Sequence, residues 1–316
     1  MTKNNEKSIE NRNLLIIGSG PAGLSAAIYA ARAELKPLIL TGITLHGQVA
    51  ITDVVENYPG FPEGIGGSEL GQLFQTQAER FGTEIVMDQV TSTDLHKQPY
   101  TIETYGKIIK TKSLIISTGA DHRKLGIPGE QSLTGRGVSY CGTCDGWFFK
   151  DKDIVVVGGG DSALEEGLFL TRFANSVTII HRRDELRAGA ILQKRAFNNP
   201  KIKFIWDSVV MEILGEESVE AVNLRNVKTG EEFIQQTEGV FIFIGHTPNS
   251  ELFSDFLEVD NKGYLVVNKN METNLPGVFA AGEVADPDFR QVVTSAGMGA
   301  AAAIQATRYL ESLEEE

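Results

Sequence analysis

Cysteine is scarce in this chain: Cys141 and Cys144 are the only two in 316 residues. This scarcity excludes a fold held together by several structural disulfides, and we expect a reducing compartment, the cytoplasm. Two cysteines placed at random would fall three apart in only roughly one such chain in 150, so the C-x-x-C spacing indicates a functional pair. A zinc site is the alternative, but it needs two further ligands at matched spacing, and the five histidines are scattered singly. We therefore expect no metal.

The chain also has few positively charged residues and no long apolar run. The chain has 29 Lys and Arg against 42 Asp and Glu, and its net charge of −13 disfavours binding to nucleic acid or to an anionic membrane. No apolar run approaches the length of a membrane span, and the polar opening MTKNNEKSIENRN predicts no signal peptide. What the chain does have is 41% hydrophobic residues and 33 glycines, which favours an α/β protein of two domains.

A first dinucleotide-binding pattern begins at residue 13, where NLLIIGSGPAGLSAAIYAARAELKPLIL predicts strand, glycine turn, helix and strand. Gly18 permits the sharp turn, Gly20 lets a pyrophosphate approach the backbone, and Gly23 lets the helix pack on the sheet. The acid that would bind a ribose about 20 residues later is missing, since the second strand ends at Thr41. A glycine-rich turn without function is the alternative.

A second pattern begins at residue 153 with DIVVVGGGDSALEEG, and Gly158, Gly160 and Ala163 take the three glycine roles. Its second strand, at 177–180, runs into a basic cluster made of His181, Arg182, Arg183 and Arg187. Arginines at this place suit a 2′-phosphate, which predicts NADPH rather than NADH. The alternative is a solvated basic turn.

The rest of the chain supplies further elements and two polar segments. Residues 43–62 are rich in turn formers and carry Gln48 and Asn57, whose side-chain amides can form hydrogen bonds with the edge of a planar heterocycle. The alternative is that this segment is an ordinary surface loop. Arg290, Gln291 and Val292 are expected to open an alanine-rich helix, whose N-terminus with the adjacent Arg290 would stabilise the negative charge of a reduced flavin. Capping of an ordinary C-terminal helix is the alternative. The remaining pattern predicts a helix at 65–81 and strands at 84–90, 113–120 and 278–281. Residues 201–237 alternate in the manner of strands, and the segment 239–250 is a buried strand that ends in Gly245.

Seven motifs together carry a resemblance over nearly the whole chain: GSGPAG (18–23), VENYPG (55–60), CGTCDG (141–146), GGGDSALEE (158–166), IGHTPN (244–249), GEVAD (282–286) and RQVVTSAG (290–297). In these the chain resembles the low-molecular-weight bacterial thioredoxin reductases. The resemblance implies two Rossmann-like domains, with an NADPH domain (120–249) that carries the cysteines inserted into an FAD domain (1–119 plus 250–316). It implies that two electrons pass from NADPH to FAD, to the Cys141/Cys144 disulfide and then to thioredoxin. It also implies a homodimer, for which the helices at 21–33 and 295–310 are rich in small and apolar residues.

The resemblance also assigns site residues. Cys144 would lie against the flavin, Cys141 would exchange with thioredoxin, and Asp145 would act as acid and base. The FAD positions besides the first fingerprint glycines are Ser19, Pro21, Ala22, Thr41, Gln48, Asn57, Val90, Gly282, Glu283, Arg290, Gln291 and Val292. The NADPH positions besides the second fingerprint and the basic cluster are Ser162, Ile244 and Tyr264. The chain departs from the family pattern at His46, Val49, Glu283 and Val292, and His46 near the flavin would shift its potential.

Three other functions compete with this interpretation. A thioredoxin-like exchange protein would need only the cysteines, and two nucleotide units argue against it. A flavin or NADPH sensor would not need the cysteine pair. A related flavoprotein that feeds a peroxidase carries a further N-terminal redox domain, and this chain has 12 residues before its first expected strand.

Overall fold

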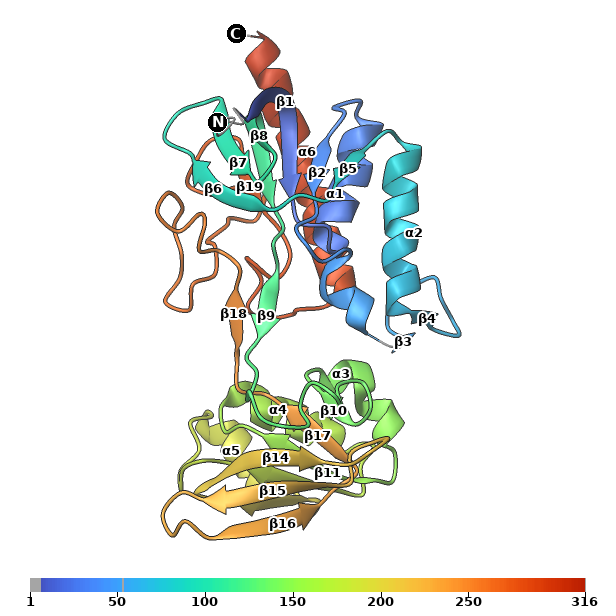
Figure 1. Ribbon diagram of the computed structural model, residues 1–316, viewed down its shortest axis with the longest axis vertical. Helices are drawn as coiled ribbons and strands as arrows, with labels where there is room; N and C mark the ends of the chain where they lie inside the picture. The colour runs from blue at the N-terminus through green and yellow to red at the C-terminus, as the bar shows by residue number, and fades with distance from the viewer. Residues whose placement is uncertain (1–6, 53, 316) are drawn as a thin grey trace, which may run out of the picture. The chain divides into compact units, whose positions relative to one another are not determined.

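The structure is a computed structural model that describes residues 7–52 and 54–315. The first six residues of the polar opening segment therefore lie outside the described part of the chain. The chain divides into two compact units, which we call unit 1 (residues 1–121 and 247–316) and unit 2 (residues 122–246), and both are drawn in Figure 1.

The described residues of unit 1 form a mixed sheet, short paired strands and three α-helices. Its elements in chain order are β1 Ser8–Ile17, α1 Pro21–Arg32, β2 Leu38–Leu40, the 3-10 helix η1 Gly47–Ile51, β3 Val54–Val55, β4 Ile65–Gly66, α2 Gly67–Arg80, β5 Glu84–Val86, β6 Val90–Asp94, β7 Tyr100–Thr104, β8 Lys107–Ile116, β9 Ala120–His122, β18 His246–Pro248, β19 Val278–Ala280 and α6 Val292–Glu315.

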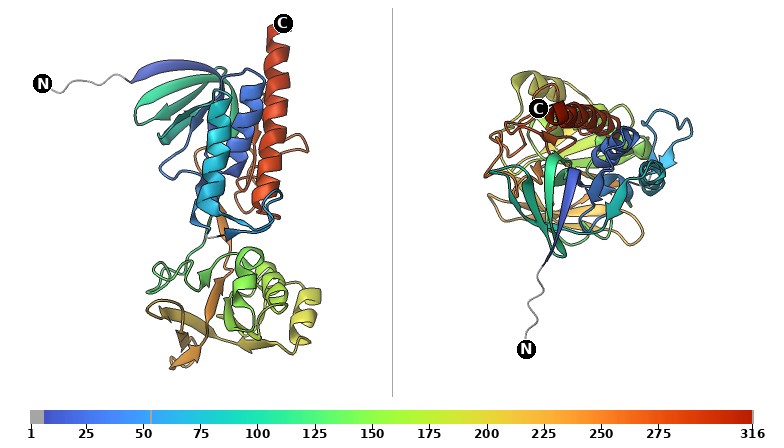
Figure 2. Two further views of the ribbon diagram at one scale, coloured as in Figure 1. Left: turned by 90° about the vertical axis from the view of Figure 1, so that its right-hand side faces the viewer. Right: turned by 90° about the horizontal axis from the view of Figure 1, so that it is seen from above.

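The main sheet of unit 1 has the strand order β5-β2-β1-β8-β7-β6, and β19 also pairs with β8. Its β5, β2, β1, β8 and β19 are parallel, whereas β7 and β6 add an antiparallel meander. The helices α2, α1 and α6 lie side by side on one face of this sheet (Figure 2). Strands covered on both faces need continuous apolar runs, and Leu14, Leu15 and Ile16 are indeed fully buried. The α/β fold with parallel strands expected from the sequence is confirmed.

Strand β1 begins at Ser8 rather than at the expected residue 13. The extra residues pair in register with the first half of β8, where Ser8 lies opposite Lys107. This half of the strand is polar and is tied by ion pairs: Glu10 accepts from Lys107 at 2.7 Å and also pairs with Arg12. Cross-strand charges rather than an apolar run extend β1, so hydrophobic periodicity could not reveal its true start.

The small residues of α1 and α6 allow these two helices of one chain to pack closely against each other. A Cβ added to Gly299 of α6 would lie 1.9 Å from the carbonyl oxygen of Ala22 in α1, so the helices could not approach as they do with any other residue there. Ala26, Ala302 and Ala306 are fully buried in the same core. The small-residue pattern that suggested a contact between two copies therefore reflects packing within one copy.

Unit 2 contains a parallel sheet of strand order β10-β17-β11-β12-β13 and an antiparallel sheet β14-β15-β16. The carboxyl ends of parallel strands meet at one edge of a sheet, so the segments that follow β11 and β12 lie close together. Its elements are β10 Val138–Ser139, α3 Gly142–Asp145, the 3-10 helix η2 Gly146–Phe149, β11 Asp153–Val157, α4 Asp161–Leu170, β12 Ser176–Ile180, α5 Ala190–Phe197, β13 Ile202–Ile205, β14 Ser208–Leu214, β15 Ala221–Asn226, β16 Glu232–Gln236 and β17 Gly239–Ile242.

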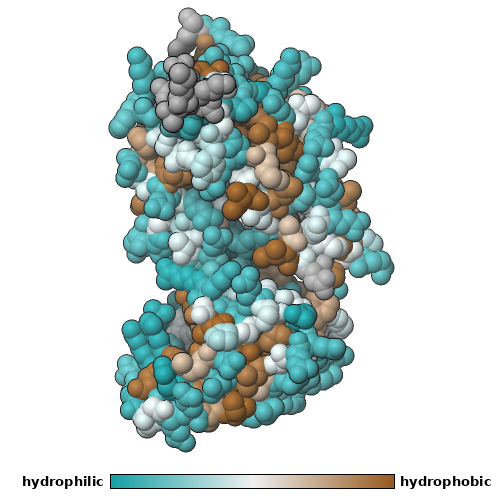
Figure 3. Space-filling model, viewed as in Figure 1, coloured by the Kyte–Doolittle hydropathy of each residue, from teal (hydrophilic) through white to brown (hydrophobic). Residues whose placement is uncertain are grey.

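The two crossings of the chain between the units pair with each other as β9 and β18. The molecular face drawn in Figure 3 is largely hydrophilic, with apolar residues in small patches. Among the described helices, including the 24-residue α6, none combines the length and hydropathy that a membrane span needs.

Candidate active site

The first glycine turn connects β1 to α1 and requires glycine at two positions. Gly18 has a φ of +106°, and a Cβ there would lie 2.2 Å from the carbonyl oxygen of Ser117. A Cβ on Gly23 would lie 1.9 Å from the carbonyl oxygen of Gly18. Either substitution would push β1, β8 and α1 apart, so the turn has the geometry that the fingerprint roles require.

The start of α1 leaves room and hydrogen-bond donors for an anion. A Cβ added to Gly20, the N-cap residue, would meet only the carbonyl oxygen of His46, at 4.0 Å. No side chain caps α1, and its first turn holds no acid. The first N–H groups of a helix lack intrahelical partners and favour negative charge, so this turn fits the pyrophosphate of a dinucleotide.

Hydrogen bonds bring four of the predicted flavin-site residues together in unit 1. The Nε2 of Gln48 donates to the main-chain oxygen of Ala120 and lies 3.5 Å from Oε2 of Glu283. The Nδ2 of Asn57 donates to Oε1 of Gln291 at 3.1 Å. Segments that are more than 230 residues apart in the chain, 48–57 and 283–291, therefore belong to one site.

Glu283 is a partly buried carboxyl group within this site. Burial raises its pKa to about 7, the carboxylates of Asp286 and Asp121 act in the same direction, and the positive charge of Arg290 opposes them. Near neutral pH this side chain is partly protonated, so it can donate a hydrogen bond as well as accept one.

Asp286, which the sequence analysis missed, shapes the segment that carries Arg290. It is 5% exposed, and its carboxylate accepts hydrogen bonds from the main-chain N–H groups of Phe289 at 2.9 Å and Arg290 at 3.0 Å. These bonds hold Arg290 at a φ of +50°. The available signal was the position of an aspartate before a proline-containing turn, where its carboxylate satisfies main-chain donors. Helix α6 begins at Val292, so Arg290 and Gln291 precede the helix that they were expected to open.

His46 occupies a left-handed backbone conformation that residues with a side chain rarely adopt. Its φ is +63°, which glycine adopts without strain. Its ring contacts α2, where Nε2 lies 2.7 Å from Oε1 of Gln75 and the absence of a side chain at Gly71 leaves room for it. Its main-chain N–H donates to Oγ of Ser19 at 3.2 Å. His46 thus reaches the first fingerprint through its main chain, while its imidazole ring is bonded to α2.

Five further residues of unit 1 that the sequence analysis named are buried or partly buried. Val49 is buried and Val292 partly buried in a small core around Leu70. Thr41 and Val90 are buried, and the N–H of Thr41 donates to the oxygen of Val86 at 3.1 Å. Tyr264, assigned to NADPH by the resemblance, is a buried residue of unit 1.

The second glycine turn connects β11 to α4 and repeats the first. A Cβ on Gly158, whose φ is +151°, would lie 2.4 Å from the carbonyl oxygen of Phe243, whereas one on Gly160 would meet nothing within 4 Å. No side chain caps α4, and the acid of its first turn, Asp161, accepts a hydrogen bond from the N–H of Gly189 at 2.7 Å. The turn therefore keeps room and donors for a second dinucleotide. Ser162 lies in the first turn of α4, Ala163 is fully buried, and Ile244 follows β17.

Three exposed arginines follow β12: Arg182, Arg183 and Arg187. Within the part of the chain that the structure describes, none of them forms an ion pair. The neighbouring acid, Asp184, pairs instead with Lys228 at 2.6 Å. The guanidinium groups are thus available to an anionic ligand such as a 2′-phosphate.

His181 lies between this basic cluster and the second glycine turn. It is 4% exposed, and its ring lies so close to Gly159 that an added Cβ would be 2.3 Å from Nδ1. Its buried Nε2 has no hydrogen-bond partner among the described residues. Burial lowers its pKa, as do the three nearby arginines, although a hydrogen bond with the main chain of Glu185 acts in the opposite direction. A neutral ring with one unsatisfied nitrogen fits a ligand hydroxyl at this place.

Cys141 and Cys144 form a disulfide, with their Cα atoms 5.3 Å apart. Cys141 is the N-cap residue of α3, and the N–H of Cys144 donates to its sulfur at 3.2 Å. The hydroxyl of Thr143 lies 3.4 Å from the same sulfur. Both cysteines are partly exposed. Donors at the Cys141 sulfur favour its thiolate once the disulfide opens, which suits this residue to thiol exchange.

Asp145 follows Cys144 directly, and a buried serine binds its carboxylate. The hydroxyl of Ser139 donates to Oδ2 of Asp145 at 2.6 Å, and the N–H of Asp145 donates to the oxygen of Cys141 at 3.2 Å. Sequence reasoning missed Ser139. The available signal was a serine two residues before the first cysteine, but its role depends on how α3 turns back over β10.

Two large side chains are exposed immediately after the cysteine pair. Trp147 is 54% exposed and Phe148 is 44% exposed. Phe173 contacts Trp147 edge to face at 6.0 Å, and the Nζ of Lys150 lies 5.6 Å from the centre of the Trp147 ring. Apolar side chains that are left in solvent beside a reactive disulfide indicate a surface for a partner. The sequence analysis missed them, and the available signal was a run of three aromatic residues directly after the cysteine motif.

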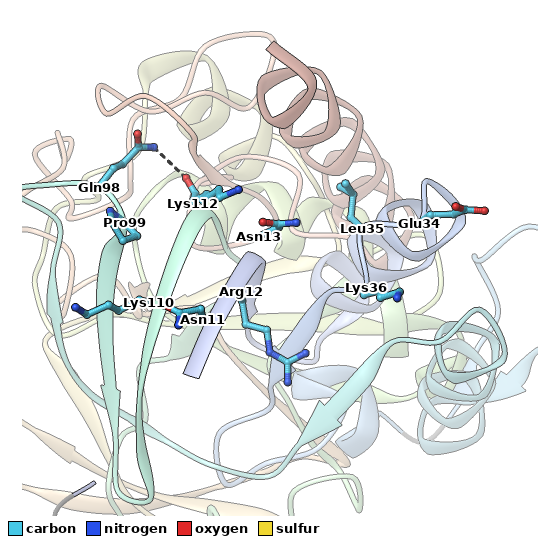
Figure 4. A pocket seen from close by; sticks show the side chains of 10 residues that line it. All are labelled: Asn11, Arg12, Asn13, Glu34, Leu35, Lys36, Gln98, Pro99, Lys110 and Lys112. Carbon is cyan, nitrogen blue, oxygen red and sulfur yellow. Dashed lines mark hydrogen bonds between the residues drawn. The ribbon is translucent and has the colours of Figure 1, made fainter. Parts of the chain in front are cut away.

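A pocket of about 830 Å³ in unit 1 contains none of the predicted site residues (Figure 4). It lies over the first half of β1, where Asn11 is in register with Lys110, whereas the glycine turn follows the opposite end of that strand. Dinucleotides bind at the carboxyl ends of parallel strands, so we assign no cofactor to this pocket. Its lining consists of Asn11, Arg12, Asn13, Glu34, Leu35, Lys36, Gln98, Pro99, Lys110 and Lys112.

Comparison with known proteins agrees with this geometry. The model of the pyridine nucleotide-disulphide oxidoreductase family matches residues 12–299. The thioredoxin reductase of Streptomyces coelicolor is 52% identical over 308 residues, which are 96% of each chain. The crystal structure of thioredoxin reductase from Streptococcus pyogenes is similar with a TM-score of 0.91 and 45% identity, over 96% of this chain and 99% of that chain. A ferredoxin-flavin thioredoxin reductase from Clostridium acetobutylicum has a TM-score of 0.53 and 29% identity, over 98% of this chain and 100% of that chain. The chain belongs to the pyridine nucleotide-disulphide oxidoreductases and, within them, to the thioredoxin reductases.

Proposed function

We propose that this protein is an NADPH-dependent thioredoxin-disulfide reductase that uses FAD. The observation that carries the proposal is a partly exposed disulfide, Cys141–Cys144, in the same unit as a dinucleotide turn followed by three arginines. An exchange protein that uses the cysteines alone would need no dinucleotide turn. A sensor would need no disulfide.

Unit 1 would hold FAD. The turn at Gly18 to Gly23 and the start of α1 fit its pyrophosphate, and the amides of Gln48 and Asn57 lie with Glu283 and Gln291 in one polar site. When bound, FAD supplies the capacity to take two electrons from NADPH and to pass them to a disulfide. The remaining residues proposed for this site are Ser19, Pro21, Ala22, Thr41, Val90, Gly282, Arg290 and Val292.

Unit 2 would hold NADPH. One similar protein is named a ferredoxin-flavin thioredoxin reductase, so we base the proposal of NADPH on the residues of this chain rather than on the fold. The donor set of this chain supports NADPH, because Arg182 and Arg183 have no carboxylate partner among the described residues and the orphaned Nε2 of His181 lies beside Gly159. The 2′-phosphate of NADPH would satisfy the arginines through charge-assisted bonds.

The exchange with thioredoxin would begin at Cys141. Its thiolate attacks one sulfur of the thioredoxin disulfide and releases the other as a thiolate that takes up a proton. Cys144 then loses its proton and attacks Cys141, which restores the enzyme disulfide and releases thioredoxin as a dithiol. Asp145 would accept and return the proton. We propose that thioredoxin docks on the exposed rings of Trp147 and Phe148.

We further propose that the protein acts as a homodimer in a reducing cytoplasm. Tyr29 on α1 and Val293 and Ile304 on α6 are each at least 40% exposed, which supports a contact between copies through the outer faces of these helices. The only two cysteines of the chain form the reactive pair and none is left for a structural disulfide, which supports a reducing cytoplasm.

A coupled assay tests the proposed function. The purified protein should be yellow and should oxidise NADPH only when an oxidised thioredoxin is present. Cys144→Ser should still accept electrons from NADPH at the flavin but should not turn over thioredoxin. Turnover with no member of a thioredoxin panel, or full turnover by Cys144→Ser, would overturn the proposal.

A further inference from the structure

Ser139 is the last residue of β10 and has a fixed position beside the cysteine pair. It lies opposite Phe241 in the parallel pairing of β10 with β17. It is only 4% exposed, so water cannot readily replace the hydrogen bonds of its hydroxyl group. The hydroxyl group of Ser139 therefore acts through its hydrogen bonds to other protein groups.

The hydroxyl group of Ser139 joins two parts of the redox segment. The main-chain N–H of Cys141 donates to Oγ at 3.1 Å, and Oγ lies 2.6 Å from Oδ2 of Asp145 and 3.2 Å from the oxygen of Cys141. A serine hydroxyl has one hydrogen, and it goes to the closer carboxylate oxygen, because a charge-assisted bond is about twice as strong as a neutral one. The result is a hydrogen-bonded chain from the Cys141 amide through Ser139 to Asp145.

Neither sulfur is part of this chain. The bonds join a main-chain amide, a hydroxyl group and a carboxylate, so opening or closing of the disulfide makes or breaks none of them. A carboxylate held in this way does not depend on either sulfur for its position. Such fixed placement is what a group that transfers protons in every turnover requires.

We propose that Ser139 is a positioning residue that fixes Asp145 for proton exchange with the thiols. The inference rests on the proposed thioredoxin reduction, and it concerns the step that restores the enzyme disulfide. There, the proton lost by Cys144 passes to Asp145, the sulfur–sulfur bond to thioredoxin breaks as Cys144 bonds to Cys141, and the proton passes to the departing thioredoxin sulfur.

Steady-state and single-turnover kinetics test this role. Ser139→Ala should lower kcat with thioredoxin about tenfold, the loss expected for one charge-assisted hydrogen bond, while reduction of the flavin by NADPH stays unchanged. Ser139→Thr, which keeps a hydroxyl group, should restore most of the rate. Ser113→Ala is the matched control, because Ser113 is fully buried in β8 and its hydroxyl donates to the oxygen of Gly277 at 2.8 Å, far along the chain from the cysteines.

A double-mutant cycle separates positioning from a general structural effect. If Ser139 acts through Asp145, adding Ser139→Ala to Asp145→Asn should cost less than twofold in kcat. Losses that multiply in the double variant would overturn the proposal, as would an unchanged rate in Ser139→Ala.

Amide hydrogen exchange gives a readout that needs no thioredoxin. The Cys141 amide should exchange at least about tenfold faster in Ser139→Ala than in the wild type or in Ser113→Ala, because its acceptor is lost. If Ser139→Ala folds poorly, Asp145→Asn tests the same chain from its other end: it keeps the acceptor of the Cys141 amide but removes the charge that polarises the Ser139 hydroxyl group, and should speed this exchange to a smaller extent. Unchanged exchange in these variants would refute the role of Ser139, whereas failure of the wild type to reduce thioredoxin would refute the proposed function only.

Discussion

The main-chain N–H of Cys144 donates to the sulfur of Cys141 at 3.2 Å, inside the small ring that the disulfide closes. When the disulfide opens, this donor still lies next to Cys141 and favours its thiolate over that of Cys144. We therefore expect iodoacetamide to label Cys141 of the dithiothreitol-reduced protein at least about threefold faster than Cys144 at pH 7. Peptide mass spectrometry at short labelling times measures the two rates. Faster labelling of Cys144 would reverse the proposed order of the two cysteines.

Arg182 and Arg183 should decide between the two nicotinamide cofactors. Replacing both with alanine removes charge-assisted bonds worth about 1.5 to 3 kcal/mol each, so kcat/KM for NADPH should fall at least about tenfold while that for NADH barely changes. Arg195→Ala removes an exposed charge from α5 of the same unit and is the control. Equal losses for both nucleotides in the double variant would show that the pair is structural.

Glu283 should make the flavin-free protein less stable as the pH rises. Its folded-state pKa of about 7 lies above the ordinary value of 4.5, so the folded state holds a proton that the unfolded state has lost. The resulting stability is fully present below pH 4.5 and is lost as the pH rises through 7. Glu283→Gln should remove this loss and should unfold in urea with about 1 to 3 kcal/mol more stability than the wild type at pH 8. An identical pH dependence in the two proteins would contradict this assignment.

The exposed rings of Trp147 and Phe148 should matter for thioredoxin alone. Replacing both with alanine should raise the KM for thioredoxin about tenfold or more, because truncation of a large aromatic contact typically costs over 1 kcal/mol. The rate at which NADPH reduces the flavin should not change. Phe197→Ala removes a ring that is 55% exposed on α5 and should leave the KM unaltered. A KM for thioredoxin that is the same in all three proteins would place docking elsewhere.

The sequence predicted those features that a local pattern determines. Gly18 and Gly158 stand in turns where an added Cβ would collide with the end of a neighbouring strand. Only glycine fits at these positions, so the glycine spacing in the sequence is enough to locate the turns. The arginines after β12 could be located for a similar reason, since their distance from the glycine turn is set by one helix, α4, and one strand, β12.

Features that depend on tertiary contacts could not be predicted in this way. The polar start of β1 is held by an ion pair with β8, and the contact of Ser139 with Asp145 arises only because α3 folds back toward the end of β10. The alanines and glycines of α1 and α6 do mark a close contact, but composition could not say whether it lies within one chain or between two. His46 has a φ of +63°, and its ring bonds Gln75, 29 residues away, which no local pattern indicates.

The central claim is that Cys141 passes electrons to thioredoxin and Cys144 completes the exchange. A thioredoxin that keeps one of its two active cysteines, activated with 5-thio-2-nitrobenzoate, tests this claim most directly. Reduced Cys144→Ser should release one thionitrobenzoate per chain and form a covalent complex that dithiothreitol reverses, with Cys141 identified at the junction by mass spectrometry. Cys141→Ser should form the complex at least about tenfold more slowly. Complex formation through Cys144 at an equal rate, or none in either variant, would contradict the account.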